Sequence, residues 1–73
     1  MTPTAISTIL TNREKEVLTL LANDLTSKQV GTELGITHKT VEAHRENIKN
    51  KTHIRGLAGL TKLAITLGLV KVE

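Results

Sequence analysis

Residues 27–46, SKQVGTELGITHKTVEAHRE, contain two helical patterns separated by only a few residues. Gly31 falls where the two helices must approach closely, because a residue without a side chain does not hold two backbones apart. Gly35, four residues later, is able to adopt the left-handed conformation that ends a helix. Thr37 is a suitable N-cap for the next helix. The spacing therefore predicts a helix-turn-helix.

The second helix of this pair has an apolar side and a polar side. Five apolar residues are expected to pack the pair against the rest of the domain: Val30, Leu34, Ile36, Val41 and Ile48. The exposed side of the second helix is expected to carry His38, Lys39, Thr40, Glu42, Ala43, Arg45, Glu46 and Lys49. This mixture of donors, acceptors and cations is typical of a helix that enters a groove of DNA.

Helical periodicity and capping residues predict four helices along the chain. Their expected ranges are about 12–22, 27–34, 39–52 and 57–67. Thr11 with Glu14, and Thr26 with Gln29, have the spacing of capping boxes at the first two starts. Gly68 is placed to end the fourth helix in a Schellman motif. Since no strand pattern is sustained, we predict an all-α fold, a compact four-helix domain that contains a helix-turn-helix.

The chain has the length of one small domain. Its 73 residues bury a core that provides only marginal stability. Residues 1–10 show no sustained period and include Pro3, so we expect a linker or disordered segment there and the domain itself over residues 11–73. No apolar stretch approaches the roughly 20 residues that span a bilayer. We expect a soluble, unsecreted, cytoplasmic domain with no membrane partner.

The charge and aromatic content of the chain narrow its partners. The net charge is +3, and the segment from Lys39 to Arg55 holds five cations and only two anions. Positive potential therefore gathers on and after the outward helix. The chain has no Phe, Tyr or Trp, which removes the stacking platforms that most modules use to hold unstacked bases. Duplex DNA is the better candidate.

Residues that carry catalytic or metal chemistry are scarce. The three histidines, His38, His44 and His53, are six and nine residues apart, so no two lie one helical turn apart as chelating pairs do. Cys is absent, and the only serines are Ser7 and Ser27, neither with a base and an orienting acid at a suggestive spacing. We predict no metal site, no cofactor and no enzymatic activity. His44 is expected to be a packed histidine on the inward side.

Three strings of the chain resemble one known family. In wording, order and spacing, LTNREKEVLTLLA, SKQVGTELGI and KTVEAHRENIKNK resemble the C-terminal DNA-binding domain of LuxR-type (NarL/FixJ-like) bacterial transcription regulators, over residues 10–70. The resemblance implies the output domain of a response regulator. It also implies that the third helix enters the major groove and that the fourth pairs two copies. The family usually has Gly, Ala and Leu at Asp24, Gly31 and Thr52, and a Ser-Arg pair at Gly56 and Leu57.

The first two turns of a helix in the major groove face base edges. The candidates for base contact are therefore His38, Lys39, Glu42, Ala43 and Glu46, and the resemblance favours the last four. Carboxylates accept from cytosine N4, Lys39 donates to guanine O6 or N7, and the Ala43 methyl meets a thymine methyl. In the alternative interpretation, Glu42 and Glu46 are solvated surface residues with Arg45 and Lys49 as helix neighbours.

Phosphate contacts are expected on either side of these residues. The candidates are Ser27, Lys28, Thr40, Arg45, Lys49 and Lys51. The amino end of the helix at residues 27–34 adds partial positive charge and free amide donors. The alternative for each cation is an ordinary solubilising charge.

The fourth helix has two apolar stripes. Leu60, Leu63, Ala64 and Leu67 are expected in the core, and the second stripe consists of Ala58, Thr61 and Ile65. The family resemblance favours weak homodimerisation through that second stripe, strengthened on DNA with two half-sites. In the alternative, Ile65 is an ordinary exposed residue on a monomer.

The leading hypothesis is a sequence-specific, double-stranded-DNA-binding domain of a transcription regulator, with RNA polymerase as a further candidate partner. Two alternatives remain open. One is a promoter-reading module like that of a sigma factor, against which the string KTVEAHRENI and the fourth helix argue. The other is a helical protein-interaction domain whose basic face meets an acidic partner.

Overall fold

The fold is described from a computed structural model, over residues 9–70. The helices within this range are α2 (Asn12–Ala22), α3 (Ser27–Leu34), α4 (His38–Thr52) and α5 (Leu57–Thr66). Residues 9–70 contain no strand. The predicted all-α, four-helix fold is confirmed.

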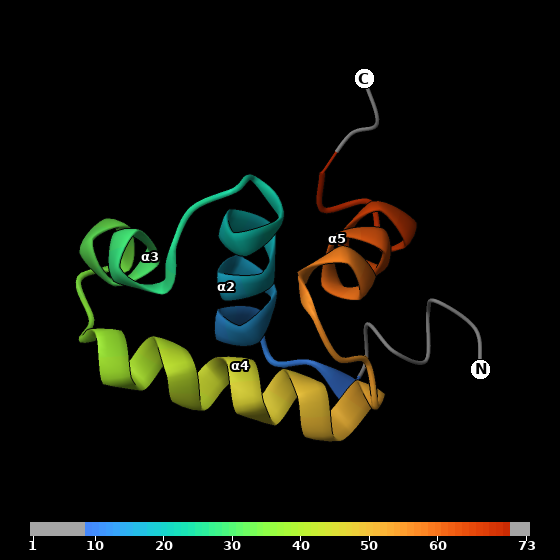
Figure 1. Cartoon of the computed structure of the whole chain (residues 1–73), viewed down its shortest axis with the longest axis horizontal. Helices are drawn as coiled ribbons and strands as arrows, with labels where there is room; N and C mark the ends of the chain where they lie inside the picture. The colour runs from blue at the N-terminus through green and yellow to red at the C-terminus, as the bar shows by residue number, and fades with distance from the viewer. Residues whose placement is uncertain (1–8, 71–73) are drawn as a thin grey trace.

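The longest helix, α4, lies along one edge of the molecule, with α2, α3 and α5 on the same side of it (Figure 1). Helix α2 stands in the middle and contacts each of the other three helices. Helix α3 packs against α4 on one side of α2, and α5 packs against α2 on the other. No helix of the described range covers the far side of α4 (Figure 1).

The core consists of aliphatic side chains from all four helices and from Leu10. Its buried members are Leu10, Val17, Leu18, Leu21, Val30, Val41, Ile48, Leu60, Leu63 and Ala64. The predicted inward residues Leu34, Ile36 and Leu67 are partly buried against them. Leu10 stands at the end of the segment predicted to be a linker, yet it is only 4% exposed. Residues 1–8 of that segment lie outside the described range.

The first two helices of this range, α2 and α3, each start with a capping box, as predicted. The Thr11 hydroxyl accepts from the backbone N–H of Glu14 at 3.1 Å, and the Glu14 carboxylate accepts from the Thr11 N–H at 2.9 Å. Thr26 and Gln29 form the same pair of bonds at 3.1 and 2.8 Å. Each box satisfies two backbone donors that a helix start otherwise leaves without partners.

The turn between α3 and α4 depends on the two predicted glycines. A Cβ on Gly31 would lie 2.7 Å from the carbonyl oxygen of Ile36, so any side chain there would collide with backbone. Gly35 has a φ of 70°, and the Ile36 N–H donates to the Gly31 carbonyl at 2.9 Å. Thr37 caps α4, which begins at His38. The helix-turn-helix prediction is confirmed.

The end of α5 also follows its prediction closely. Gly68 has a φ of 75°, and the Leu69 N–H donates to the Ala64 carbonyl at 2.9 Å, which is the long bond of a Schellman motif. The helix ends at Thr66, one residue before its predicted end. None of the described helices combines the length and the apolar character needed to cross a membrane.

Candidate nucleic-acid interface

The two sides of α4 have opposite character. Val41 and Ile48 on the inward side have no exposed surface. The five residues predicted to contact bases are all exposed: His38, Lys39, Glu42, Ala43 and Glu46. Their spacing places them within the first two and a half turns of the helix. The structure therefore brings these residues together on one uncovered stretch, called here the exposed side of α4.

The carboxylates on the exposed side of α4 lie beside basic side chains of the same helix. One Glu42 oxygen lies 3.8 Å from Arg45 Nη1 and the other lies 3.4 Å from His38 Nε2. A Glu46 oxygen lies 2.9 Å from Lys49 Nζ. The five side chains are between 37% and 61% exposed, so each pair contributes at most about 1 kcal/mol to stability. The carboxylates can therefore exchange these partners for others at little cost.

Arg45 also connects α4 to the start of α3. Its Nη1 donates a long hydrogen bond of 3.4 Å to the hydroxyl of Ser27, the first residue of α3. Ser27 is only 8% exposed, whereas its neighbour Lys28 is exposed. The structure thus brings Arg45 to Ser27, 18 residues earlier in the sequence, and next to Ser27 lies Lys28, another predicted phosphate contact. They meet at a helix amino end, where backbone amides and the helix dipole favour anions.

Thr40 and Lys49, the next two candidates for phosphate contact, both reach solvent. Thr40 is exposed, and its hydroxyl lies 2.9 Å from that of Thr37. Lys49 is 41% exposed and is engaged by Glu46. Both lie beside the exposed side of α4, in positions compatible with a DNA backbone.

Lys51 has a partner that sequence spacing does not reveal. Its Nζ donates to the carboxylate of Glu14 on α2 at 2.7 Å, and that carboxylate is only 4% exposed. Burial alone raises the pKa of Glu14. The hydrogen bonds from Lys51 and Thr11 and the charge of Lys51 together lower it by more, so the pKa lies below its ordinary value of 4.5. This pair ties the end of α4 to the start of α2. The side chain of Lys51 thus points into the domain, toward α2.

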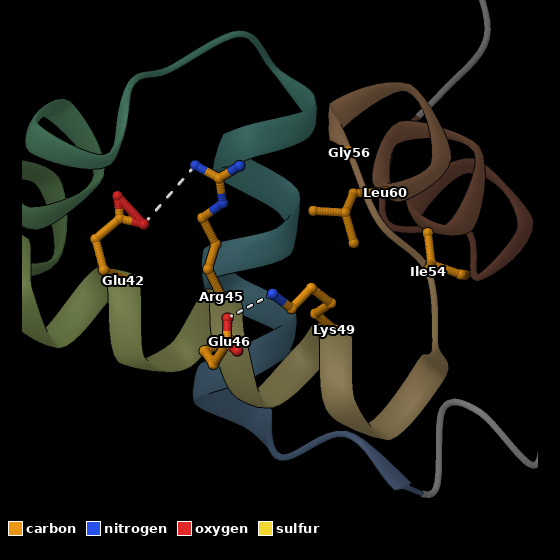
Figure 2. Close-up of a pocket in the computed structure, with 7 residues that line it drawn as sticks. All are labelled: Glu42, Arg45, Glu46, Lys49, Ile54, Gly56 and Leu60. Atoms are coloured by element: carbon orange, nitrogen blue, oxygen red, sulfur yellow. Dashed lines mark ion pairs between the residues drawn. The ribbon is translucent and has the colours of Figure 1, made fainter.

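A small hollow of about 130 Å³ lies between α4 and α5 (Figure 2). Its α4 wall consists of the four charged side chains Glu42, Arg45, Glu46 and Lys49. Its other wall is formed by Ile54, Gly56 and Leu60. Figure 2 shows the two ion pairs along the rim of this hollow. The charged groups therefore lie at the surface with room to move.

A family model described as bacterial regulatory proteins, luxR family, matches residues 8–64 of the chain. The chain belongs to this family. Membership confirms the prediction of a LuxR-type helix-turn-helix domain, which serves DNA binding and transcription regulation.

Curated relatives of the luxR-family chain are bacterial proteins that are mostly much longer. The chain is 40% identical over 63 residues to the uncharacterized response regulatory protein YgeK of Escherichia coli, and the match covers 86% of this chain and 43% of that protein. It is 41% identical to the transcriptional regulatory protein MctR of Rhizobium johnstonii, over 84% of this chain and 28% of that protein. It is 34% identical to the transcriptional regulatory protein FixJ of Azorhizobium caulinodans, over 88% of this chain and 30% of that protein. The chain thus spans less than half the length of these three relatives. No solved structure matches it significantly.

Two further polar residues of the luxR-family helix α4 were not among the sequence candidates. Asn47 and Asn50 are both exposed. They lie four and seven residues after Ala43, on the same stretch of the helix surface. Side-chain amides bind adenine edges in the major groove. Extending the helical spacing beyond the second turn would have found them.

The remaining predicted residues lie on α5 and on the flank of α4. In the stripe expected to pair two copies, Ala58 is exposed, while Thr61 and Ile65 are half-buried. The neighbouring Leu57 is 44% exposed. His44 is half-buried on the flank of α4. No three side chains of the types His, Asp and Glu converge as a metal site within residues 9–70.

Proposed function

We propose that this chain binds double-stranded DNA in a sequence-dependent manner, with α4 in the major groove, as the output domain of a transcription regulator in the bacterial cytoplasm. The observation that carries the proposal is the exposed side of α4, which is polar, uncovered and held rigidly by a buried opposite side. A helix fits the major groove, which is about 12 Å wide. The printed names of MctR and FixJ, both transcriptional regulatory proteins, support the same conclusion.

Each base-contacting residue has a separate role in this proposal. Lys39 donates to guanine O6 or N7, and Glu42 and Glu46 accept from the amino group of cytosine. The Ala43 methyl packs on a thymine methyl, and His38 donates or accepts at the start of the helix. These contacts choose the sequence.

Phosphate contacts hold α4 in register along the groove. Ser27 and Lys28 contribute from the start of α3, and Thr40, Arg45 and Lys49 from α4 itself. Lys51 is left out of the proposed phosphate set, because Glu14 already holds its ammonium 2.7 Å away. Contacts of this kind position the protein and do not choose the sequence.

The direct test is a binding titration with labelled duplexes at rising salt. A bound sequence is first recovered from a pool of random duplexes. The domain should bind it at least 1,000-fold, as an order of magnitude, more tightly than random sequence, and both affinities should fall steeply with salt. Binding that is insensitive to salt, or equal for all duplexes, would contradict the proposal and favour a protein partner instead.

Two exposed alanines provide a matched pair of variants. Ala43→Asp places a negative charge against the DNA and should weaken binding roughly tenfold or more. Ala58→Asp makes the same chemical change on α5 and should leave affinity for a single half-site unchanged. Both positions are exposed, so both variants should fold. Equal losses in the two variants would show that α4 is not the contact surface.

A second proposal is that two copies pair through Ala58, Thr61 and Ile65 on DNA with two half-sites. The exposed Leu57 beside this stripe adds apolar surface to it. On a duplex with half-sites about one helical turn apart, the native chain should bind cooperatively. Ala58→Asp should abolish that cooperativity. Cooperativity that survives this substitution would contradict pairing through α5.

A further inference from the structure

All carboxylates of α4, a helix described in full, lie within 4 Å of a cation of the same helix. Glu42 is shared between His38 and Arg45, at 3.4 and 3.8 Å, and Glu46 lies 2.9 Å from Lys49. Figure 2 shows the pair formed with Arg45 and the pair formed with Lys49 on the rim of the hollow between α4 and α5. We call Glu42–Arg45 and Glu46–Lys49 the two α4 pairs.

The two α4 pairs cancel much of the positive charge with which α4 would meet DNA. Lys51, the remaining cation of the last turn, is already bound to Glu14 of α2. Within the described residues, this leaves Lys39 as the one lysine or arginine of α4 without a carboxylate at ion-pair distance. The four cations and two carboxylates of α4 leave it a formal charge of +2, but among the residues that the structure describes only one of these cations, Lys39, stands free of a carboxylate in the free protein.

Arg45 is held between two different environments. Its Nη1 lies 3.8 Å from Glu42 and 3.4 Å from the Ser27 hydroxyl at the start of α3. The start of α3 is a proposed phosphate-binding position. A phosphate bound at the start of α3 would therefore compete with the Glu42 carboxylate for this guanidinium.

We propose that Glu42 and Glu46 determine selectivity by suppressing the binding of non-cognate DNA. This inference rests on the proposed function. On a non-cognate duplex the carboxylates face base acceptors, remain beside Arg45 and Lys49, and offset the attraction of these cations for phosphates. On the cognate sequence each carboxylate accepts a hydrogen bond from a cytosine amino group instead, and the two released cations contact phosphates of the DNA backbone.

The size of the effect follows from counterion release. One additional cation–phosphate contact makes the slope of log affinity against log salt steeper by about 0.9. At about 0.1 M salt, this corresponds to roughly eightfold tighter binding. Removing one carboxylate charge should therefore strengthen the binding of random sequence by about that factor and reduce the selectivity.

The test compares Glu46→Gln with Glu33→Gln. Both remove one negative charge, but Glu33 lies on α3, beside Leu34 and facing α2 across a groove that includes Thr19 and Leu20. Binding to labelled random-sequence duplex is measured by fluorescence anisotropy between about 0.05 and 0.2 M salt. Glu46→Gln should bind roughly eightfold more tightly near 0.1 M with a steeper slope, whereas Glu33→Gln should stay within about twofold of the native chain.

A double variant assigns the gain to the pair itself. In the Lys49→Ala background, Glu46→Gln should lose most of its gain, since no lysine remains to be released. The inference is overturned if Glu46→Gln and Glu33→Gln behave alike, or if the gain persists in full without Lys49. Failure of the native chain to bind any duplex would instead contradict the proposed function, so the two failures are distinguishable.

Discussion

The inward and exposed sides of α4 are built from interactions of different strength. On the inward side, Val41 and Ile48 are completely buried, and Lys51 holds a carboxylate that is only 4% exposed. On the exposed side, the charged groups form short-range pairs that are more than a third exposed. Buried contacts contribute stability, while exposed pairs contribute little and exchange partners readily. The same helix therefore provides a rigid support on one side and an adaptable surface on the other.

The largest expected effect is on the inward side. Ile48→Ala should lower the free energy of unfolding by about 2–4 kcal/mol, because Ile48 has no exposed surface and its loss leaves a cavity. Urea unfolding followed by far-UV circular dichroism measures this, since the chain has no Trp or Tyr for fluorescence.

Asn50→Ala on the exposed side is the control. It should change stability by less than about 0.5 kcal/mol. Equal destabilisation by the two variants would mean that the sides of α4 do not differ as described.

A smaller effect is expected from the pair that joins α4 to α2. Lys51→Met leaves the nearly buried Glu14 carboxylate with only its bond from Thr11, and should cost about 1–2 kcal/mol, discounted because Lys51 itself is one-third exposed. Its effect on DNA affinity should be small. A large loss of DNA affinity in a folded Lys51→Met variant would show that Lys51 does contact phosphate.

Glu14 also gives the stability a defined pH dependence. Its pKa is lower in the folded protein than the ordinary 4.5, so its contribution is fully present above pH 4.5 and is lost as the pH falls through the folded pKa. The free energy of unfolding, measured by urea denaturation at a series of acidic pH values, should show this loss in the native chain and a smaller loss in Glu14→Gln. Identical acid profiles would contradict the ionised pair.

The smallest predicted change concerns the end of α2, far from the exposed side of α4. Asp24 has a φ of 69°, and the next N–H, of Leu25, donates to the Leu20 carbonyl at 3.3 Å, as at a Schellman ending. Asp24→Gly should raise the free energy of unfolding by about 1 kcal/mol, because the left-handed conformation costs an L-residue about that much. DNA affinity should not change.

Gly35→Ala is the matched opposite of this substitution. Gly35 has nearly the same φ, 70°, and open space around it, so strain alone should destabilise the variant by a similar amount. If Asp24→Gly is not stabilising while Gly35→Ala is destabilising, the strain at Asp24 is relieved by contacts of its own side chain.

Local features of the fold could be predicted from the sequence. The capping threonines and glycines set the helix ends to within one residue, since each acts on backbone groups three to five residues away. The periodicity of apolar residues identified Val41, Ile48, Leu60 and Leu63 as core. Both kinds of signal act over short distances along the chain.

The electrostatic arrangement of the interface could not be predicted in the same way. The bonds from Lys51 to Glu14 and from Arg45 to Ser27 join residues 37 and 18 positions apart, so they depend on how the helices pack. In the alternative to base contact, Glu46 is a solvated surface residue with Lys49 as its helix neighbour. The structure shows Glu46 paired with Lys49 in the free domain, so the proposed base contact requires an exchange of partners.

The central claim, that the exposed side of α4 contacts DNA, is tested most directly by mapping amide chemical shifts of the ¹⁵N-labelled domain as the selected duplex is added. The largest shifts should fall at residues 38–50 and at the start of α3, while Leu20, Glu33 and Leu34, around the groove between α2 and α3, should barely move. Shifts concentrated in that groove, with α4 unchanged, would contradict the account.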